Sequence, residues 1–235
     1  MLAHLRNNYR AIKKTWRACK GEELLQKPQV RCRTKTLGTD GAAWTICLDG
    51  LSVNSVIYSF GVGEEISFDL ELISTLGATV HAFDPTPKSI GWVEANELPC
   101  QFVFHSYGIA ADDGTRRFVP PVNPNHVSHT LLERNSPWPA VEAQVFRLSS
   151  IMQTLGHQKV DVLKMDIEGA EYEVLEDVLN ANIAIGQLLV EFHHRWPEIG
   201  VDRTRRALRE LNSAGYQIFS VSPSGEEYGL IKISD

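Results

Sequence analysis

Short apolar runs alternate along the chain with stretches whose apolar residues recur at helical spacing. Five apolar runs predict β-strands, at residues 56–60, 78–83, 102–107, 160–165 and 187–192. Helical spacing predicts α-helices between and after them, at residues 66–76, 87–98, 149–155, 172–178 and 204–214. Strands and helices in alternation form a parallel sheet with helices on both faces, so the chain is predicted to have an α/β fold.

Two further apolar runs close the chain, at residues 216–221 and 228–233. The segment between them contains PSGEE, which is typical of a turn, so the two runs predict an antiparallel hairpin. We expect this hairpin to add one antiparallel strand at the edge of the sheet.

The first 54 residues precede this alternation and carry two elements of their own. Apolar residues from Leu2 to Cys19 recur at three- and four-residue steps, which predicts an amphipathic helix with Arg and Lys on its other faces. Residues 37–51 predict a small lead-in hairpin that we expect to lie outside the catalytic core. The chain is therefore divided into a helical arm with this hairpin, residues 1–54, and a main domain, residues 55–235.

Charge is distributed unevenly between the two parts. Residues 1–35 hold ten Lys or Arg and two Glu, a net charge of +8, whereas the remaining 200 residues hold thirteen basic and 27 acidic residues, a net charge of −14. A nucleic-acid-binding protein is more often basic over its main domain, so no nucleic-acid partner is expected. The basic helix could dock on the main domain or join two copies in a homodimer, lie on a membrane surface, or contact RNA or another anionic partner.

Composition indicates the class of protein. The 235 residues are 43% hydrophobic and 22% charged, which is ordinary for a soluble globular protein. No apolar run approaches the roughly 18 residues of a membrane span, so no transmembrane segment is expected. Basic residues interrupt the N-terminus, which lacks the apolar core of a signal peptide. The four cysteines form no CxxC pair, so we expect buried thiols and a reducing, cytoplasmic compartment.

The first strand of the main domain ends in a glycine turn. Gly61 and Gly63 lie where the strand passes into the following helix, and glycine there allows tight turning and close approach of a ligand to helix N–H groups. The third glycine of a dinucleotide fingerprint is absent. Glu64 and Glu65 would repel a pyrophosphate and tolerate a cationic centre, which disfavours NAD and favours a sulfonium ligand that carries an amino group.

An acid ends the second strand. Asp84 follows Gly63 by 21 residues, close to the spacing of about 20 residues at which an acid binds a ribose diol in nucleotide-binding folds. A carboxylate suits a diol because it accepts two hydroxyl hydrogen bonds at once. The alternative is that Asp84 only caps the helix that begins at Pro87.

Three acids follow the fourth strand at short spacing, Asp166, Glu168 and Glu171. Ligands in open α/β sheets bind outside the carboxyl ends of the strands, so this segment places negative charge where chemistry is expected. Glu168 and Glu171 have a structural alternative, because they begin a helix whose dipole favours acids. Lys164 is interpreted as a buried pairing partner of Glu191.

Two histidines follow the fifth strand. His193 or His194 could act as a general base on an acceptor hydroxyl, because imidazole titrates near neutrality and this strand end faces the expected cleft. A divalent ion held by Asp166, Glu168 and a histidine is conceivable, but no metal-binding spacing is present and no metal is predicted. The polar segment 111–145 is longer than an ordinary loop and is a candidate lid over the site.

These motifs together resemble the FkbM family of S-adenosylmethionine-dependent methyltransferases. The resemblance covers roughly residues 55–235 and rests on the strand-four motif DIEGAE, with the segment AFDPTP as its second part. It implies a Rossmann-like class I methyltransferase sheet of seven strands, mostly parallel, with an antiparallel last strand. It also implies the residues around S-adenosylmethionine: Gly61 and Gly63 at the methionine part, Asp84 at the ribose, Gly108 and Ile109 at the adenine, and Asp166 beside the sulfonium.

The chain departs from the family pattern at two positions. Ser59 stands where members usually have an acid, and Glu65 stands where most have a third glycine. Glu65 could therefore hold the methionine end of the cofactor.

The sequence thus predicts a methyltransferase that acts on a small-molecule acceptor, transferring a methyl group from S-adenosylmethionine to a hydroxyl of a carbohydrate or other natural product. Catalysis would consist largely of aligning the acceptor with the sulfonium methyl group. The catalytic candidates are Asp166, Glu168, His193 and His194. The alternative from another class is a non-catalytic module that binds S-adenosylmethionine or an adenosine ligand, and a dehydrogenase is disfavoured.

Overall fold

The computed structural model describes residues 15–121, 130–131 and 136–233. Most of the apolar stripe predicted from Leu2 to Cys19 lies outside the described residues, as does the homodimer contact predicted for it, and residues 15–19 are helical. Among the described residues, no helix is both long and apolar enough to cross a bilayer. The domain boundary at residue 55 stays a prediction.

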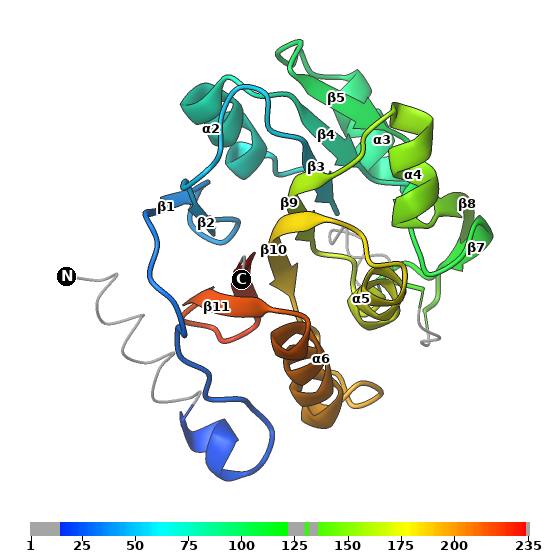
Figure 1. Ribbon diagram of the computed structural model, residues 1–235. Coiled ribbons are helices and arrows are strands. Elements are labelled where there is room, and N and C mark those ends of the chain that lie inside the picture. Colours follow the sequence, from blue (N-terminus) through cyan, green and yellow to red (C-terminus); the bar gives the residue numbers. More distant parts are fainter. Residues whose placement is uncertain (1–14, 122–129, 132–135, 234–235) are drawn as a thin grey trace.

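A seven-stranded sheet forms the centre of the molecule (Figure 1). Its strands lie in the order β11 (Tyr216–Val221), β12 (Glu227–Lys232), β10 (Ile185–Glu191), β9 (Val160–Met165), β3 (Ile57–Phe60), β4 (Val80–Phe83) and β5 (Phe102–His105). Neighbouring strands from β10 to β5 pair parallel, whereas β12 runs antiparallel to both β10 and β11. The predicted Rossmann-like sheet, mostly parallel with an antiparallel last strand, is confirmed.

The position predicted for the antiparallel strand was wrong, because β12 lies inside the sheet between β10 and β11. Helix α6 (Val201–Ser213) carries the chain past the position beside β10, so that β11 becomes the edge strand. The turn at residues 222–226 then folds β12 back into the gap beside β10. A hairpin pattern in the sequence does not say which of its two strands pairs with the rest of the sheet.

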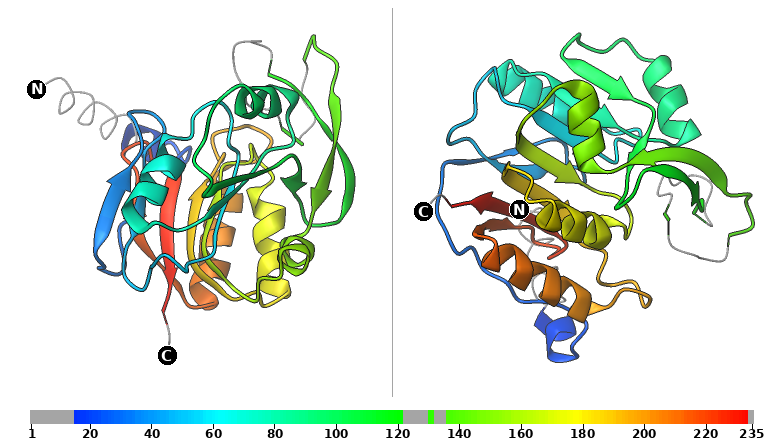
Figure 2. Two further views of the ribbon diagram at one scale, coloured as in Figure 1. Left: turned by 90° about the horizontal axis from the view of Figure 1, so that it is seen from above. Right: turned by 45° about the vertical axis from the view of Figure 1, so that its right-hand side comes forward.

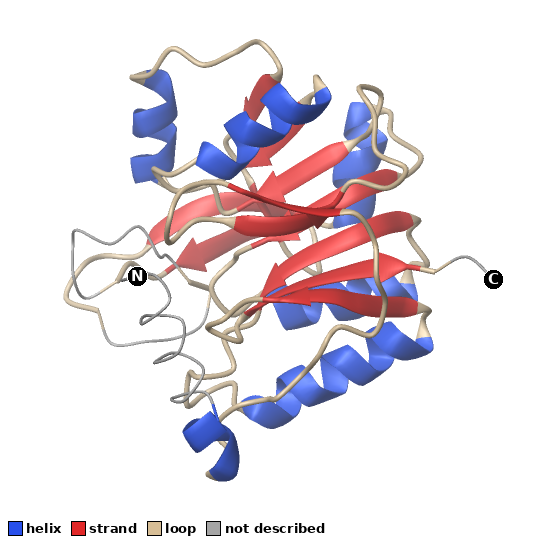
Figure 3. Ribbon diagram, turned by 90° about the vertical axis from the view of Figure 1, so that its left-hand side faces the viewer, coloured by secondary structure: helices blue, strands red, loops and turns tan. Residues whose placement is uncertain are grey.

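Helices cover both faces of the sheet, as Figures 2 and 3 show. Helices α4 (Leu148–Leu155), α5 (Glu171–Asn180) and α6 pack in one apolar cluster, and α2 (Ser67–Leu76) and α3 (Pro87–Glu94) pack in a second. Consecutive residues of one strand enter opposite clusters, for example Val162 and Leu163 of β9. The central strands are continuous apolar runs because both of their faces are buried.

The lead-in hairpin is present and packs against the main sheet. Strands β1 (Thr34–Leu37) and β2 (Trp44–Cys47) pair antiparallel, and their apolar side chains belong to the same cluster as α2. The buried amide of Gln187 on β10 accepts a hydrogen bond from the Cys47 N–H at 3.1 Å and donates one to the Cys47 carbonyl at 2.7 Å. These contacts fix the hairpin beside α2, on the face where its turn can reach the carboxyl ends of the strands.

The polar segment after β5 forms part of a small second sheet, in the order β6 (Gly108–Ile109), β8 (Val141–Phe146) and β7 (Gly114–Phe118). Phe118 and Leu131 of this segment line the cavity described below. Residues 122–129 and 132–135 of the predicted lid lie outside the described residues, and the lid stays a prediction.

Candidate functional site

A cavity of about 360 Å³ lies at the carboxyl ends of β3, β4, β9 and β10. Parallel strands deliver these ends to one edge of the sheet, which is where ligands bind in open α/β folds. Eight of the residues predicted for the site line the cavity: Gly61, Gly63, Glu65, Asp84, Gly108, Ile109, Asp166 and Glu168. His193 and His194 are not among its lining residues. The tertiary structure therefore brings together all the residues predicted to bind the cofactor.

Gly61 is required where β3 and β9 end side by side. Its backbone has a φ of 83°, and a Cβ atom there would lie 1.8 Å from the carbonyl oxygen of Asp166. The N–H of Asp166 in turn donates to the Phe60 carbonyl at 3.1 Å. A side chain at position 61 would therefore push apart the two strand ends that form the floor of the cavity.

The Asp84 carboxylate is almost completely buried and organises two turns at once. Its Oδ2 accepts a hydrogen bond from the Gly63 N–H at 3.0 Å, and its Oδ1 accepts hydrogen bonds from the Thr86 N–H at 2.9 Å and hydroxyl at 2.7 Å. Thr86 is the N-cap residue of α3, so Asp84 holds the residue before the helix and, among its hydrogen bonds to the described residues, caps none of the helix N–H groups. Each carboxylate oxygen has two lone pairs, so Oδ2 still has one acceptor site for a ligand in the cavity.

Glu65 connects the hairpin turn to the start of α2 through two hydrogen bonds. Its Oε1 accepts the Ser67 N–H at 2.7 Å and its Oε2 accepts the Thr39 hydroxyl at 3.2 Å. The hydrogen bonds from Ser67 lower the pKa of Glu65, so it is a carboxylate engaged on both oxygens. Residues 39–44 of the hairpin thereby line the cavity, although the sequence analysis placed the hairpin outside the catalytic core. No local pattern marks this contact, because it depends on packing across the sheet.

A second buried carboxylate, Asp69 of α2, lines the cavity and was missed by the sequence analysis. The buried hydroxyl of the neighbouring strand residue Ser59 interacts with the Asp69 carboxylate, although neither this hydroxyl nor Asp69 Oδ1 has a partner at ordinary hydrogen-bond geometry among the described residues. Burial raises the pKa of Asp69, while the positive charge of Lys164 opposes that rise. An acid in the first turn of a helix is a common surface pattern, so nothing in the sequence distinguishes Asp69.

The pairing of Lys164 with Glu191 that was expected from the sequence is not formed in the described part of the chain. The Lys164 ammonium group donates to the Gly61 carbonyl at 3.1 Å and interacts electrostatically with Asp69, and no ion pair with Glu191 is found among the described residues. Lys164 lies on the α2 side of the sheet with Val162 and lines the cavity, where the Gly61 carbonyl and Asp69 are its partners.

His193 lies directly behind the cavity, held by Glu171. The fully buried Glu171 carboxylate accepts the His193 N–H at 3.0 Å and its ring Nδ1–H at 3.2 Å through Oε1, and the Gly169 N–H at 2.9 Å through Oε2. Glu171 therefore does more than interact favourably with the helix dipole, because it also orients the imidazole of His193. The other ring nitrogen, Nε2, lies 3.4 Å from Glu168 Oε2 and 3.9 Å from Asp166 Oδ1.

The charges around His193 decide its protonation. Burial would lower its pKa, but the hydrogen bond and charge of Glu171, with the charges of Glu168 and Asp166, raise the pKa of His193 to about 10. Burial and the charge of Asp166 raise the pKa of Glu191, at the end of β10, to about 9. An imidazolium has no lone pair, so the base role predicted for His193 does not fit this protonation state.

His194 points away from the cavity into a buried ion pair with the N-terminal segment. Its Nε2 lies 2.7 Å from Glu23 Oε1, and the Arg195 guanidinium contacts the other oxygen of the same carboxylate. Although burial opposes ionisation, hydrogen bonds from His194 and Arg195 lower the pKa of Glu23 to about 2. The structure thus gives His194 a contact that anchors residues near position 23, and does not bring it to the predicted site.

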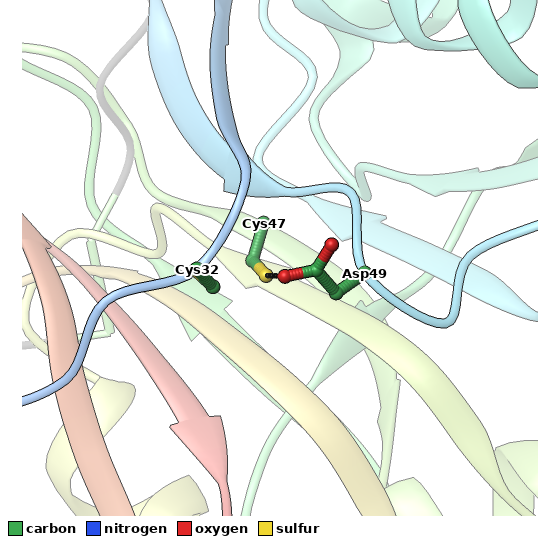
Figure 4. Close-up of side chains that lie close together, drawn as sticks. All are labelled: Cys32, Cys47 and Asp49. Carbon is green, nitrogen blue, oxygen red and sulfur yellow. Dashed lines mark hydrogen bonds between the residues drawn. The ribbon is translucent and has the colours of Figure 1, made fainter.

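Cys32, Cys47 and Asp49 form a separate group of side chains beside the lead-in hairpin (Figure 4). The Cys47 thiol donates to Asp49 Oδ2 at 3.7 Å, and the same oxygen accepts the Arg33 N–H at 3.0 Å. Burial and the neighbouring Cys47 raise the pKa of the Cys32 thiol to about 12. The Arg33–Asp49 hydrogen bond joins the segment before β1 to the segment after β2, and Cys32, Cys47 and Asp49 do not line the cavity.

The sequence of this chain is similar to a methyltransferase family model and to proteins that carry methyltransferase names. A family model described as the methyltransferase FkbM domain matches residues 58–218. The human protein named probable methyltransferase-like protein 24 is 29% identical over 222 residues, which cover 81% of this chain and 53% of that protein. The hexuronic acid methyltransferase AglP of Haloferax volcanii is 26% identical over 134 residues, which cover 56% of this chain and 54% of AglP.

A solved structure of a methyltransferase FkbM from Methylobacillus flagellatus KT is 14% identical, with a TM-score of 0.48, over 77% of this chain and 44% of that one. The chain spans about half the length of the curated relatives that it matches.

Proposed function

We propose that this chain, which belongs to the FkbM methyltransferase family, transfers a methyl group from S-adenosylmethionine to a hydroxyl oxygen of a carbohydrate or another small natural product. The observation that carries the proposal is the convergence, in one cavity, of the Gly61–Gly63 turn with the carboxylates of Asp84 and Asp166. A glycine turn with an acid at the next strand end suits a nucleoside, and a second carboxylate suits a positively charged sulfur.

The residues present fit this donor. Asp84 keeps one acceptor site for a ribose hydroxyl, and Gly108 and Ile109 line the cavity where the adenine is expected. The amino-acid end of the donor carries an ammonium and a carboxylate. Asp69 and Lys164 offer the two opposite charges beside one another, whereas the Glu65 carboxylate is already engaged by Ser67 and Thr39. We therefore assign the amino-acid end to Asp69 in place of Glu65.

S-adenosylmethionine, when bound, supplies a methyl group on a positively charged sulfur. The protein then has to align the acceptor hydroxyl with that methyl group, exclude water and accept the hydroxyl proton. Asp166 and Glu168 line the cavity, and we assign them as the candidate acceptors of the hydroxyl proton. His193 contributes by holding these two side chains in place.

The acceptor class is supported by one relative. AglP of Haloferax volcanii is named a hexuronic acid methyltransferase, and 56% of this chain aligns with it. A sugar hydroxyl is consistent with a cavity edge that presents the carboxylates of Asp166, Glu168 and Glu191, because carboxylates accept hydrogen bonds from hydroxyls.

Isothermal titration of the full chain with S-adenosylmethionine tests donor binding, and radiolabelled methyl transfer to a panel of uronic acids and neutral sugars tests the reaction. We expect saturable binding and transfer to at least one hydroxylated acceptor. Absence of binding by the folded protein would overturn the proposal. Binding without transfer to any acceptor would support the non-catalytic module instead.

A further inference from the structure

Three potential metal ligands meet where β9 and β10 end. Asp166 follows the last residue of β9, Glu191 is the last residue of β10, and His193 lies two residues further on. The parallel pairing sets Val190 opposite Met165, so Glu191 and Asp166 are the next neighbours across the two strands. One ligand atom from each of the three side chains lies within 4.8 Å of the others.

The orientation of His193 supplies a second observation. The Glu171 carboxylate only accepts hydrogen bonds, so Nδ1 carries the hydrogen that faces it and Nε2 is the nitrogen that faces the acids. The His193 side chain is only 8% exposed, and its Nε2 faces the carboxylate oxygens of Glu168 at 3.4 Å and Asp166 at 3.9 Å. A buried imidazole whose far nitrogen is fixed by a carboxylate has the arrangement of a metal-ligating histidine.

The charges of Asp166, Glu191 and His193 are also compatible with a bound cation. Within the described part of the chain, Asp166 pairs with His193 at 3.9 Å, and neither Asp166 nor Glu191 forms an ion pair with Lys or Arg. His193 carries the positive charge among these carboxylates in the cation-free protein, and a divalent cation bound at Nε2 would take the place of the Nε2 proton.

We propose that Asp166, Glu191 and His193 bind one divalent cation at the inner edge of the cavity. Two carboxylate oxygens and one imidazole nitrogen suit Mn²⁺ or a cation of similar preference. Three protein ligands leave coordination positions open. These open positions face the cavity because Asp166 and Glu191 line it. An acceptor hydroxyl is the group that would occupy an open position, a role that rests on the proposed function, whereas cation binding itself does not.

Electron paramagnetic resonance of Mn²⁺ titrated into the full chain tests this site, because bound Mn²⁺ loses the signal of the free ion. We expect one Mn²⁺ per chain, with affinity reduced by about tenfold or more in Glu191→Gln. Glu198→Gln, an exposed acid on the loop after His193, is the matched control and should bind as the wild type does. Equal binding by the wild type and Glu191→Gln, or no binding by the wild type, would overturn the proposal.

The folding of the variants and the binding of the donor are tested in separate experiments. Thermal melting checks that Glu191→Gln is folded, and Asp166→Asn replaces it in the comparison if it is not. Calorimetric titration with S-adenosylmethionine in EDTA measures donor binding without any divalent cation. Loss of donor binding there would count against the proposed function, while the Mn²⁺ result alone decides the cation site.

Discussion

The backbone N–H of Gly63 donates a 3.0 Å hydrogen bond to the carboxylate of Asp84. The turn after β3 and the end of β4, which the sequence analysis expected at the methionine and ribose parts of one ligand, are therefore in direct contact. The same carboxylate binds Thr86 at the start of α3. A substitution of Asp84 is therefore expected to affect both ligand binding and the conformation of two turns.

Replacement of Asp84 by Asn should weaken donor binding by about tenfold or more, since hydrogen bonds to a charged group contribute about 1.5–3 kcal/mol. The amide keeps one oxygen for the Thr86 donors, so the fold should be retained. Isothermal titration of Asp84→Asn against Asp202→Asn, whose side chain is 93% exposed, measures the effect. Equal affinity of the two variants would remove Asp84 from the binding site.

Asp69→Asn should weaken binding of S-adenosylmethionine but leave binding of methylthioadenosine, which lacks the amino-acid end, almost unchanged. The reason is that we expect the buried Asp69 carboxylate to face the donor ammonium, whereas the nucleoside part is expected near Asp84. Asp84→Asn is the internal comparison, because it should weaken both ligands. A parallel loss of both ligands in Asp69→Asn would show a structural effect and not recognition of the ammonium.

Gly61→Ala should lower the free energy of unfolding by about 3 kcal/mol or more, because the new methyl group would collide with the Asp166 carbonyl. Gly91→Ala is the matched control: it lies in α3 with no atom within 4 Å of the added Cβ. There alanine should stabilise the helix by up to about 1 kcal/mol. Urea denaturation followed by circular dichroism gives both values, and similar stabilities of the two variants would contradict the close approach of β3 and β9.

Glu23→Gln should destabilise the protein by about 3 kcal/mol at pH 7, because it removes the carboxylate that pairs with His194 and Arg195. The pKa of Glu23 is lower in the folded protein, about 2, than its ordinary value of 4.5. Its contribution is therefore fully present above about pH 4.5 and is lost as the pH falls toward 2. The stability difference between wild type and variant should shrink over that range.

The neighbouring exposed acid gives the control for this measurement. Glu22 lies 4.0 Å from Arg17 with half of its side chain exposed, so Glu22→Gln should change the free energy of unfolding by less than about 1 kcal/mol at any pH. A difference for Glu23→Gln that stays constant from pH 7 to pH 3 would show that its ionisation does not stabilise the fold.

The sequence by itself determined the sheet and the residues at its strand ends. Apolar runs such as 160–165 specify strands buried on both faces, and right-handed connections bring their carboxyl ends to one edge. Gly61, Gly63, Asp84 and Asp166 then lie at that edge whatever the details of packing. Local pattern suffices for them because backbone geometry alone carries each residue to the cavity.

Only the tertiary structure decided which side chains touch. Glu23 pairs with His194 across 171 positions, Thr39 bonds Glu65 from the hairpin turn, and β12 enters the sheet beside β10. The same polar residue could lie in water or in a buried pair, and the sequence pattern is identical in both cases. Burial, charge and protonation at His193 and Asp69 follow from neighbours distant in the chain, which no local periodicity records.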